Sequence, residues 1–318
     1  MIYLLKDIIN PINWIKLFLN PSKIPGLFDR IFAYPGLRFG GIKSPVYRKK
    51  IILLLTYFAK KNKNFRKFFY QNSIDDLEAN NKNFTFDISK KNIFFLEKKQ
   101  EIFEKLKKYG VIVIENALDD NEHNLIKSKF KDIVKDNKFR IKNMKSEDTI
   151  SKFLNKEITF EHNLLKLSRI VTSEIYGKPI EPKLTYYYSK SKRLPEQNFP
   201  GDNNMHFDRF LPNIKIIYFP NEVDENSSPF RYALGSHLID NRYLDFFIKN
   251  EKNFYDERNN KIEVFNNCPE VKINLKQNSL IIALTNGLHG RTPFKKISER
   301  CGVFLTYSKF NMLSLLNL

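Results

Sequence analysis

The sequence predicts an α+β protein whose mainly β core consists of two sheets flanked by helices. Two observations carry this prediction: helical patterns end near residue 177, and several short apolar strands separated by turns follow them. With 318 residues, of which 42% are hydrophobic and 14% aromatic, the chain has enough apolar surface for a large folded core. A basic helical appendage with its linker, residues 1–95, is expected to precede the β domain at 96–318.

The first 72 residues are predicted to be basic and helical. They hold fourteen Lys and Arg against two acids, so +12 of the net charge of +19 belongs to them. Asn10-Pro11 is a typical helix opening, because Asn caps the first N–H groups and Pro lacks an N–H that would go unpaired there. A second helix is expected near 51–59, followed by a basic aromatic stretch from Lys60 to Tyr70. The Asn-rich residues 73–95 suit a linker.

The charge of this appendage has three interpretations. The simplest is a helical cover packed on the β core with its lysines in solvent. A second is peripheral contact of residues 1–72 with an anionic membrane surface, to which Trp14 and Phe18 are suited. A nucleic-acid arm is the least favoured, because no recognised nucleic-acid motif accompanies the basic aromatic stretch.

Several features favour a cytoplasmic or membrane-peripheral protein. The longest apolar run, Ile51 to Ala59, is far shorter than the roughly 20 residues that span a bilayer. No signal peptide is evident at the N-terminus. The two cysteines, Cys268 and Cys301, lack metal-type spacing and indicate a reducing compartment rather than a disulfide framework.

The elements of the core are expected in a definite order. A helix ends near Gly110, and the β-branched run Val111 to Ile114 is a strand. Helices at 119–134 and 160–176 follow from apolar residues at helical spacing, and Gly177 closes the second. Further strands are expected at Lys183–Ser189, Ile214–Phe219, Phe230–Leu234, Ser279–Leu284 and Arg300–Tyr307.

His206-Phe207-Asp208 offers two metal-ligand side chains. On a strand, residues i and i+2 face the same side, so this imidazole and carboxylate can converge on one ion. His289, in the turn after the apolar strand 279–284, is the natural third ligand. Two histidines and one carboxylate on one face of an octahedron leave three open positions, the arrangement of non-heme Fe(II) oxygenases. Two positions would take the 2-oxo acid end of 2-oxoglutarate, and the third would take O₂.

Basic and aromatic residues near this triad are candidates for ligand contacts. Arg300 begins an apolar strand eleven residues after His289, where a guanidinium can bind the far carboxylate of 2-oxoglutarate bidentately. Arg231 alternates with apolar neighbours and faces either the pocket or an exposed edge. Of Tyr186, Tyr187 and Tyr188, at least two are expected in the core, and Tyr188 is our candidate for contact with 2-oxoglutarate or substrate.

The remaining histidines have structural interpretations. His237 is a rival third ligand, but no arginine follows it at a useful distance, so a loop-capping role is expected. His123 and His162 lie in Asn- and Lys-rich helical surroundings and are predicted to be surface residues.

Taken together, four features of the sequence resemble the phytanoyl-CoA dioxygenase-like family: the His206-x-Asp208 pair, the Gly235-Ser236-His237 turn, His289-Gly290, and Arg300 at +11. The segment from Gly110 to Leu118 is also similar to that family's first strand and turn. The resemblance covers roughly residues 99–310. It implies a double-stranded β-helix (jelly-roll, cupin-like) core that uses Fe(II), 2-oxoglutarate and O₂ and releases succinate and CO₂.

The same resemblance implies residue roles. His206, Asp208 and His289 would be the catalytic iron ligands, and Arg300 would anchor 2-oxoglutarate. Many members carry a small polar residue two positions after the second histidine, where this chain has Arg291. Arg291 therefore either adds to co-substrate binding or faces the substrate.

The predicted function is hydroxylation of a small organic, lipid- or sugar-linked metabolite. Within the resemblance, Asp208 favours hydroxylation, because the related halogenases replace this carboxylate with a small residue. A non-catalytic jelly-roll binding protein with a vestigial metal site is the main alternative, and a nucleic-acid-modifying oxygenase is a third. Substrate contacts are expected on loops 190–203 and 238–270, with 190–204 as a lid.

Overall fold

The computed structural model describes residues 63–70, 77–88, 97–135, 149–154, 163–191, 205–208, 213–249 and 267–307, together with Lys49, Ile52, Leu53, Thr56, Lys60 and Phe265. The predictions for the helix after Asn10 and for membrane contact through Trp14 and Phe18 fall outside these residues, as does His162. Of the predicted lid, only Lys190 and Ser191 are described.

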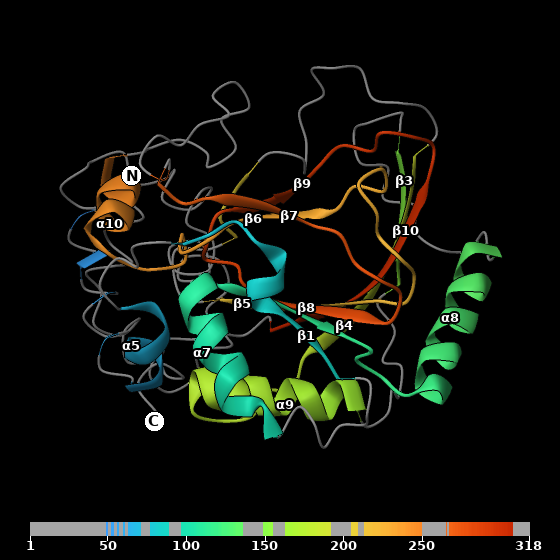
Figure 1. The fold of residues 1–318 in the computed structure, drawn as a ribbon, viewed down its shortest axis with the longest axis horizontal. Helices are drawn as coiled ribbons and strands as arrows, with labels where there is room; N and C mark the ends of the chain where they lie inside the picture. The colour runs from blue at the N-terminus through green and yellow to red at the C-terminus, as the bar shows by residue number, and fades with distance from the viewer. Residues whose placement is uncertain are drawn as a thin grey trace, which may run out of the picture.

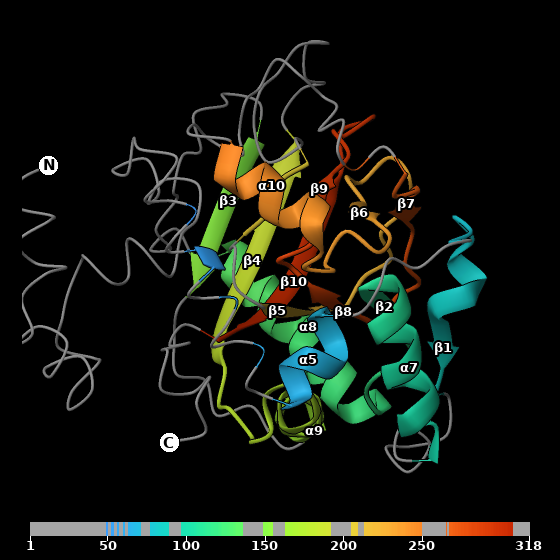
Figure 2. The ribbon, with the colours of Figure 1, turned by 90° about the vertical axis from the view of Figure 1, so that its left-hand side faces the viewer.

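Two sheets form the core (Figure 1). The larger has seven strands in the order β1-β2-β8-β5-β10-β4-β3, and Figure 2 shows β3 at one edge and β1 at the other. Its strands are β1 (Thr85–Asp87), β2 (Val111–Glu115), β3 (Thr149–Leu154), β4 (Lys183–Ser191), β5 (Ile214–Phe219), β8 (Ser279–Leu284) and β10 (Glu299–Thr306). The smaller sheet has the order β7-β6-β9, with β6 (Phe230–Ala233), β7 (Glu270–Ile273) and β9 (His289–Arg291).

The chain alternates between these sheets as it runs from β4 to β10. After β4 in the larger sheet, His206 pairs with β9 of the smaller sheet through an isolated bridge. β5 then returns to the larger sheet, β6 and β7 lie in the smaller, and β8, β9 and β10 alternate again. Eight segments wound in this way, four in each sheet, have the order of a double-stranded β-helix, which agrees with the predicted jelly roll.

The predicted elements of this core are confirmed with small shifts at their ends. The five predicted strands after residue 180 are β4, β5, β6, β8 and β10, and the run from Val111 is β2. β1, β3, β7 and β9 were not predicted. β1 and β9 have only three residues each, too few to show a two-residue period.

The described helices are α5 (Lys63–Phe69), the 3₁₀ helix η4 (Asn81–Phe84), α7 (Lys99–Tyr109), α8 (Asp120–Lys135), α9 (Asn163–Tyr176) and α10 (Asn241–Lys249). α5, α7, α8 and α9 lie on the outer side of the larger sheet, and the smaller sheet lies on its other side (Figure 1). α8 and α9 are the helices predicted at 119–134 and 160–176. None of the helices in the described part of the chain has the length and apolar character of a membrane span.

α5 comes from the predicted basic appendage and packs into the core. Its Phe65, Phe68 and Phe69 are fully buried, and Phe65 packs edge-on against Tyr176 of α9 with ring centroids 5.4 Å apart. Because these rings are buried, they cannot stack on the bases of a nucleic acid. The helical-cover interpretation therefore holds for α5, while the domain boundary near residue 95 stays a prediction.

His123 is buried, contrary to the prediction of a surface residue. Its side chain points from α8 to the outer face of the larger sheet, where its Nδ1 lies 2.6 Å from the Tyr218 hydroxyl. That hydroxyl donates to the Asn278 Oδ1 at 3.1 Å. Burial lowers the pKa of His123, so the ring is favoured in its neutral form.

Candidate metal centre

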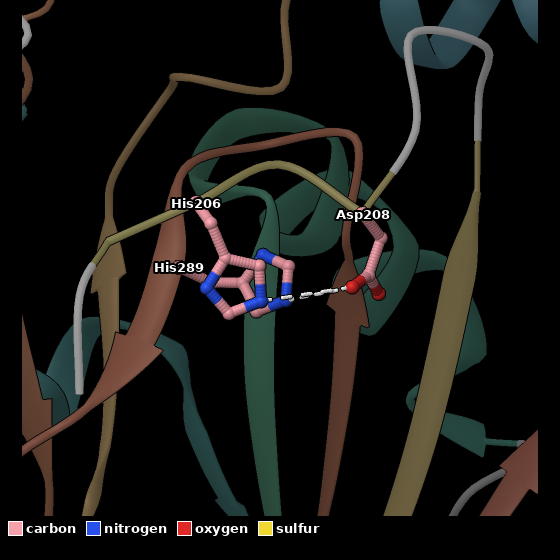
Figure 3. A group of neighbouring side chains, drawn as sticks. All are labelled: His206, Asp208 and His289. Carbon is pink, nitrogen blue, oxygen red and sulfur yellow. Dashed lines mark ion pairs between the residues drawn. The ribbon is translucent and has the colours of Figure 1, made fainter. Parts of the chain in front are cut away.

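His206, Asp208 and His289 converge in space (Figure 3). One ligand atom from each side chain lies within 4.8 Å of the others, and no second group of three His, Cys, Asp or Glu side chains does so in the described part of the chain. Asp208 Oδ1 is 3.7 Å from His206 Nε2 and 3.6 Å from His289 Nε2. These separations are too long for hydrogen bonds and leave room for an ion between the three atoms.

Backbone pairing brings His206 and His289 together. His206 and His289 exchange hydrogen bonds, with N to O distances of 2.7 and 2.9 Å, as directly opposed antiparallel residues do. Their side chains therefore leave the sheet on the same face. The Asp208 N–H donates to the Thr285 carbonyl at 2.9 Å, which holds Asp208 against the turn after β8.

Phe207 anchors the ligand segment from behind. It lies between His206 and Asp208, so its side chain points to the opposite side, away from the triad. Four aromatic rings from α10 and the segment after it surround it at centroid distances of 5.3 to 5.6 Å: Tyr243, Phe246, Phe247 and Phe265. Because residues 205–208 lie outside the strands of the two sheets, this aromatic packing supplies part of their rigidity.

The predicted role of His237 in a turn is confirmed. His237 is fully buried, and its Nε2 donates to the Lys107 carbonyl near the end of α7 at 3.0 Å. Its own carbonyl accepts from Asn286 Nδ2 at 2.8 Å, and Ser236 Oγ accepts from the Leu288 N–H at 2.8 Å. The turn at 235–237 thus holds the β8–β9 turn that precedes His289.

His289 has the tautomer that metal binding requires. Its Nδ1 lies 2.9 Å from the Gly287 carbonyl, which can only accept, so Nδ1 carries the proton. The lone pair of the neutral ring is then on Nε2, the atom that faces Asp208. Within the described part of the chain, this buried Nε2 has no hydrogen-bond partner. A buried polar atom without a partner needs an explanation, and a divalent cation bound there provides one.

Lys215 completes the electrostatics of the triad, and the sequence did not predict it. Its Nζ lies 2.7 Å from Asp208 Oδ2, while Oδ1 faces the two imidazoles. Burial alone would raise the pKa of Asp208, but Lys215 and the two imidazoles outweigh it and hold this pKa well below its ordinary value. Asp208 is therefore ionised, as a metal ligand must be. The sequence offered one indication of this role, since Lys215 is the single charged residue in the otherwise apolar strand β5.

Arg300 and Arg291 both lie beside Tyr187. The Arg300 guanidinium carbon is 5.5 Å from the centre of the Tyr187 ring, and that of Arg291 is 5.8 Å from it. Arg300 is 4% exposed, and its Nη1 donates to the Ser228 carbonyl at 2.7 Å. Both candidate arginines thus reach one spot between the sheets.

The two other candidate contact residues lie elsewhere. Tyr188 is paired with Cys301 on the face of the larger sheet opposite to Tyr187. Burial is the main cause that raises the pKa of the Tyr188 hydroxyl, and a hydrogen bond with Glu299 adds to the shift. Arg231 forms a bidentate ion pair with Glu270 at 2.8 and 2.7 Å, so it takes the outward-facing alternative.

No protein-family model matches the chain, and neither does any curated protein at a significant level. Solved structures resemble part of the chain. The epimerase SnoN, solved with Fe3+, alpha ketoglutarate and nogalamycin RO, is 11% identical over 66% of this chain and 83% of its own, with a TM-score of 0.49. A Pseudomonas putida prolyl-4-hydroxylase is 9% identical over 66% and 98%, with a TM-score of 0.42. EctD from S. alaskensis, with bound Fe, is 15% identical over 63% and 73%, with a TM-score of 0.39.

Proposed function

We propose that this protein is an Fe(II)- and 2-oxoglutarate-dependent dioxygenase of the phytanoyl-CoA dioxygenase-like type, which hydroxylates a small organic, lipid- or sugar-linked metabolite. The observation that carries the proposal is the His206, Asp208 and His289 triad, with the His289 Nε2 lone pair aimed at Asp208. Two histidines and one carboxylate form the facial set that non-heme Fe(II) oxygenases use.

The protein residues have separate tasks in this reaction. Asp208 stays ionised, and the His289 tautomer presents Nε2, so that with His206 they would hold Fe(II) and leave coordination positions for a 2-oxo acid and O₂. With these bound, the site would oxidise 2-oxoglutarate to succinate and CO₂. One oxygen atom of O₂ would enter succinate, and the other would be inserted into a substrate C–H bond. Arg300 would bind the far carboxylate of the co-substrate.

Apolar surroundings favour this chemistry. Phe230 stacks on the His289 ring with centroids 5.7 Å apart and is itself buried. On the larger sheet, Ile217 and Phe304 are opposed in register and share the inner face with Arg300. Such a lining limits water at the metal and strengthens electrostatic interactions inside the site.

A non-catalytic jelly-roll binding protein is the alternative function. It has no need of a hydrogen bond that sets the His289 tautomer or of a lysine on the second oxygen of Asp208. Both features support a working metal centre, since they are the outer contacts that orient metal ligands.

Anaerobic titration of the purified protein with Fe(II) and 2-oxoglutarate tests the proposal. We expect a weak visible charge-transfer band in the wild type, loss of the band in His206→Ala, and a weaker band at equal 2-oxoglutarate in Arg300→Ala. Arg231→Met, which removes an arginine from the outward face, is the matched control and should keep the band. A metal-replete wild type without a band would favour the binding-protein alternative.

A further inference from the structure

A second arginine shares the position of the expected co-substrate anchor. Arg291 Nη1 donates to the Tyr187 hydroxyl at 3.0 Å, and the guanidinium groups of Arg291 and Arg300 both lie within 6 Å of the Tyr187 ring centre. One arginine comes from β9 of the smaller sheet and the other from β10 of the larger. The two sheets therefore deliver two cationic side chains to one tyrosine.

Strand register places this cluster on the inner faces of both sheets. Arg300 is directly opposite Ser189, and Gly302 is opposite Tyr187, so Arg300, Ser189 and Tyr187 share one face of the larger sheet. Arg291 follows His289 by two residues on β9 and therefore faces the same way as that ligand. Two strand residues span about 7 Å, so Arg291 lies one strand repeat from the metal ligand.

Ser189 adds a buried donor to the cluster. It is fully buried, and its hydroxyl has no hydrogen-bond partner within the described residues. Tyr187 contributes a hydroxyl that already accepts from Arg291, and such a hydroxyl is a stronger donor in turn. A buried guanidinium, a half-buried one and hydroxyl donors gathered in one place match an anion with several acceptor sites.

We propose that Arg291 and Arg300, with Tyr187 and Ser189, form a two-guanidinium site for the far carboxylate of the 2-oxo acid. This inference rests on the proposed function. A carboxylate has about four lone-pair sites, enough to accept from both guanidinium groups and a hydroxyl. Arg291 is thus a co-substrate residue, which decides between the two roles that its sequence position left open.

The geometry favours contact of Arg291 with the co-substrate rather than with the substrate. A residue that contacts the substrate should diverge from the anchor of the co-substrate. Arg291 instead converges on Arg300 through Tyr187, at the end of β9 away from His206. Its guanidinium is also held by the Tyr187 hydroxyl, so it is placed before any ligand binds.

A truncated co-substrate separates this role from others. 2-Oxobutanoate has the same metal-chelating end as 2-oxoglutarate but lacks the far carboxylate. Both acids are titrated into anaerobic Fe(II)-loaded protein, and binding is measured by calorimetry and by the charge-transfer band. 2-Oxoglutarate should bind at least about tenfold more weakly to Arg291→Met than to wild type, because one charge-assisted contact is lost. Binding of 2-oxobutanoate should change less than about twofold. Arg300→Met should show the same selective loss, and Arg231→Met should show neither.

Three outcomes would overturn the inference or its basis. Unchanged 2-oxoglutarate affinity in Arg291→Met, with a selective loss in Arg300→Met, refutes the role of Arg291 and leaves the proposed function standing. Equal losses for both acids would mean that Arg291 acts on the metal end, which also refutes it. If wild-type protein binds neither acid in a metal-dependent way, the proposed function itself fails. Arg291→Lys, which keeps the charge, should show a smaller selective loss and provides the test if Arg291→Met does not fold.

Discussion

Lys215 and Asp208 form an ion pair of 2.7 Å through the carboxylate oxygen that turns away from the two imidazoles. Lys215 is opposite Ala283 of β8, and its side chain is 21% exposed. The pair holds the Asp208 carboxylate in one orientation, with Oδ1 directed at the imidazoles and Oδ2 occupied. A metal bound by the triad would therefore have a single oxygen ligand from Asp208, which preserves its open positions.

Lys215→Met should weaken metal binding without unfolding the protein. Loss of an outer contact to a ligand typically costs 10- to 100-fold in metal affinity, and we expect a decrease of about tenfold or more. Competition titration of Co(II) against a chelator measures it. Lys295→Met removes an exposed lysine that pairs with Glu225 at 3.0 Å and should leave the affinity unchanged. Equal affinity in both variants would mean that Lys215 has no part in holding the ligand.

Phe207→Leu should loosen the segment that carries two ligands. Replacement of the ring removes its contacts with the aromatic side chains around α10, at a cost of about 1–2 kcal/mol in the free energy of unfolding. Phe246→Leu, in the same cluster but not on the ligand segment, should cost a similar amount. Denaturant unfolding and Co(II) titration together distinguish them, because only Phe207→Leu should also lower metal affinity. A parallel loss of metal affinity in Phe246→Leu would contradict this.

Gly110→Ala should be strongly destabilising. Gly110 ends α7 with φ of 80°, and a Cβ there would meet His237 Nδ1 and lie 2.5 Å from the Tyr232 hydroxyl oxygen. We expect a loss of about 3 kcal/mol, from left-handed strain plus overpacking. Gly177→Ala is the control, since it has φ of 79° at an exposed position and should cost only about 1–2 kcal/mol. Equal losses in urea unfolding would exclude the steric part of this explanation.

His237 should make the protein sensitive to mild acid. Burial is the main cause that lowers the pKa of His237 to about 4, whereas the unfolded chain takes up this proton near pH 6.5. Since the unfolded state binds the extra proton first, stability is retained above pH 6.5 and falls as the pH drops toward 4. Between pH 7 and pH 5, His237 should account for a loss of about 2 kcal/mol.

His237→Gln provides the measurement of that contribution. The glutamine amide can still donate to the Lys107 carbonyl but does not titrate. Urea unfolding at pH 7 and pH 5 should show a smaller loss of stability in the variant, by about the amount assigned to His237. The same pH dependence in both proteins would place the acid-sensitive group elsewhere, with His123 as the next candidate because its pKa is also lowered.

The sequence by itself predicted most strands of the β core and the three candidate metal ligands. The short apolar runs at β2, β4, β5, β6, β8 and β10 were predictable as strands, and residues i and i+2 on extended backbone face the same side, so the convergence of His206 and Asp208 was predictable as well. The choice of His289 over His237 rested on its place after a buried strand and on Arg300 eleven residues later, since no arginine follows His237 at a useful distance. Both inferences use local geometry that neighbouring residues impose.

Only the tertiary structure decided what surrounds the triad. Tyr187 rather than Tyr188 faces Arg291 and Arg300, because the register between β4 and β10 sets which face each tyrosine occupies. A shift of one residue exchanges the two faces, and nothing within the Tyr186–Tyr188 run specifies that register.

The contact between Lys215 and Asp208, and the inward direction of Arg291, also depend on strands that pair across long stretches of the chain. Strand pairing of this kind is set by the packing of the whole core. For that reason the sequence predicted the candidate metal ligands, whereas the residues that orient and charge them could be identified only from the fold.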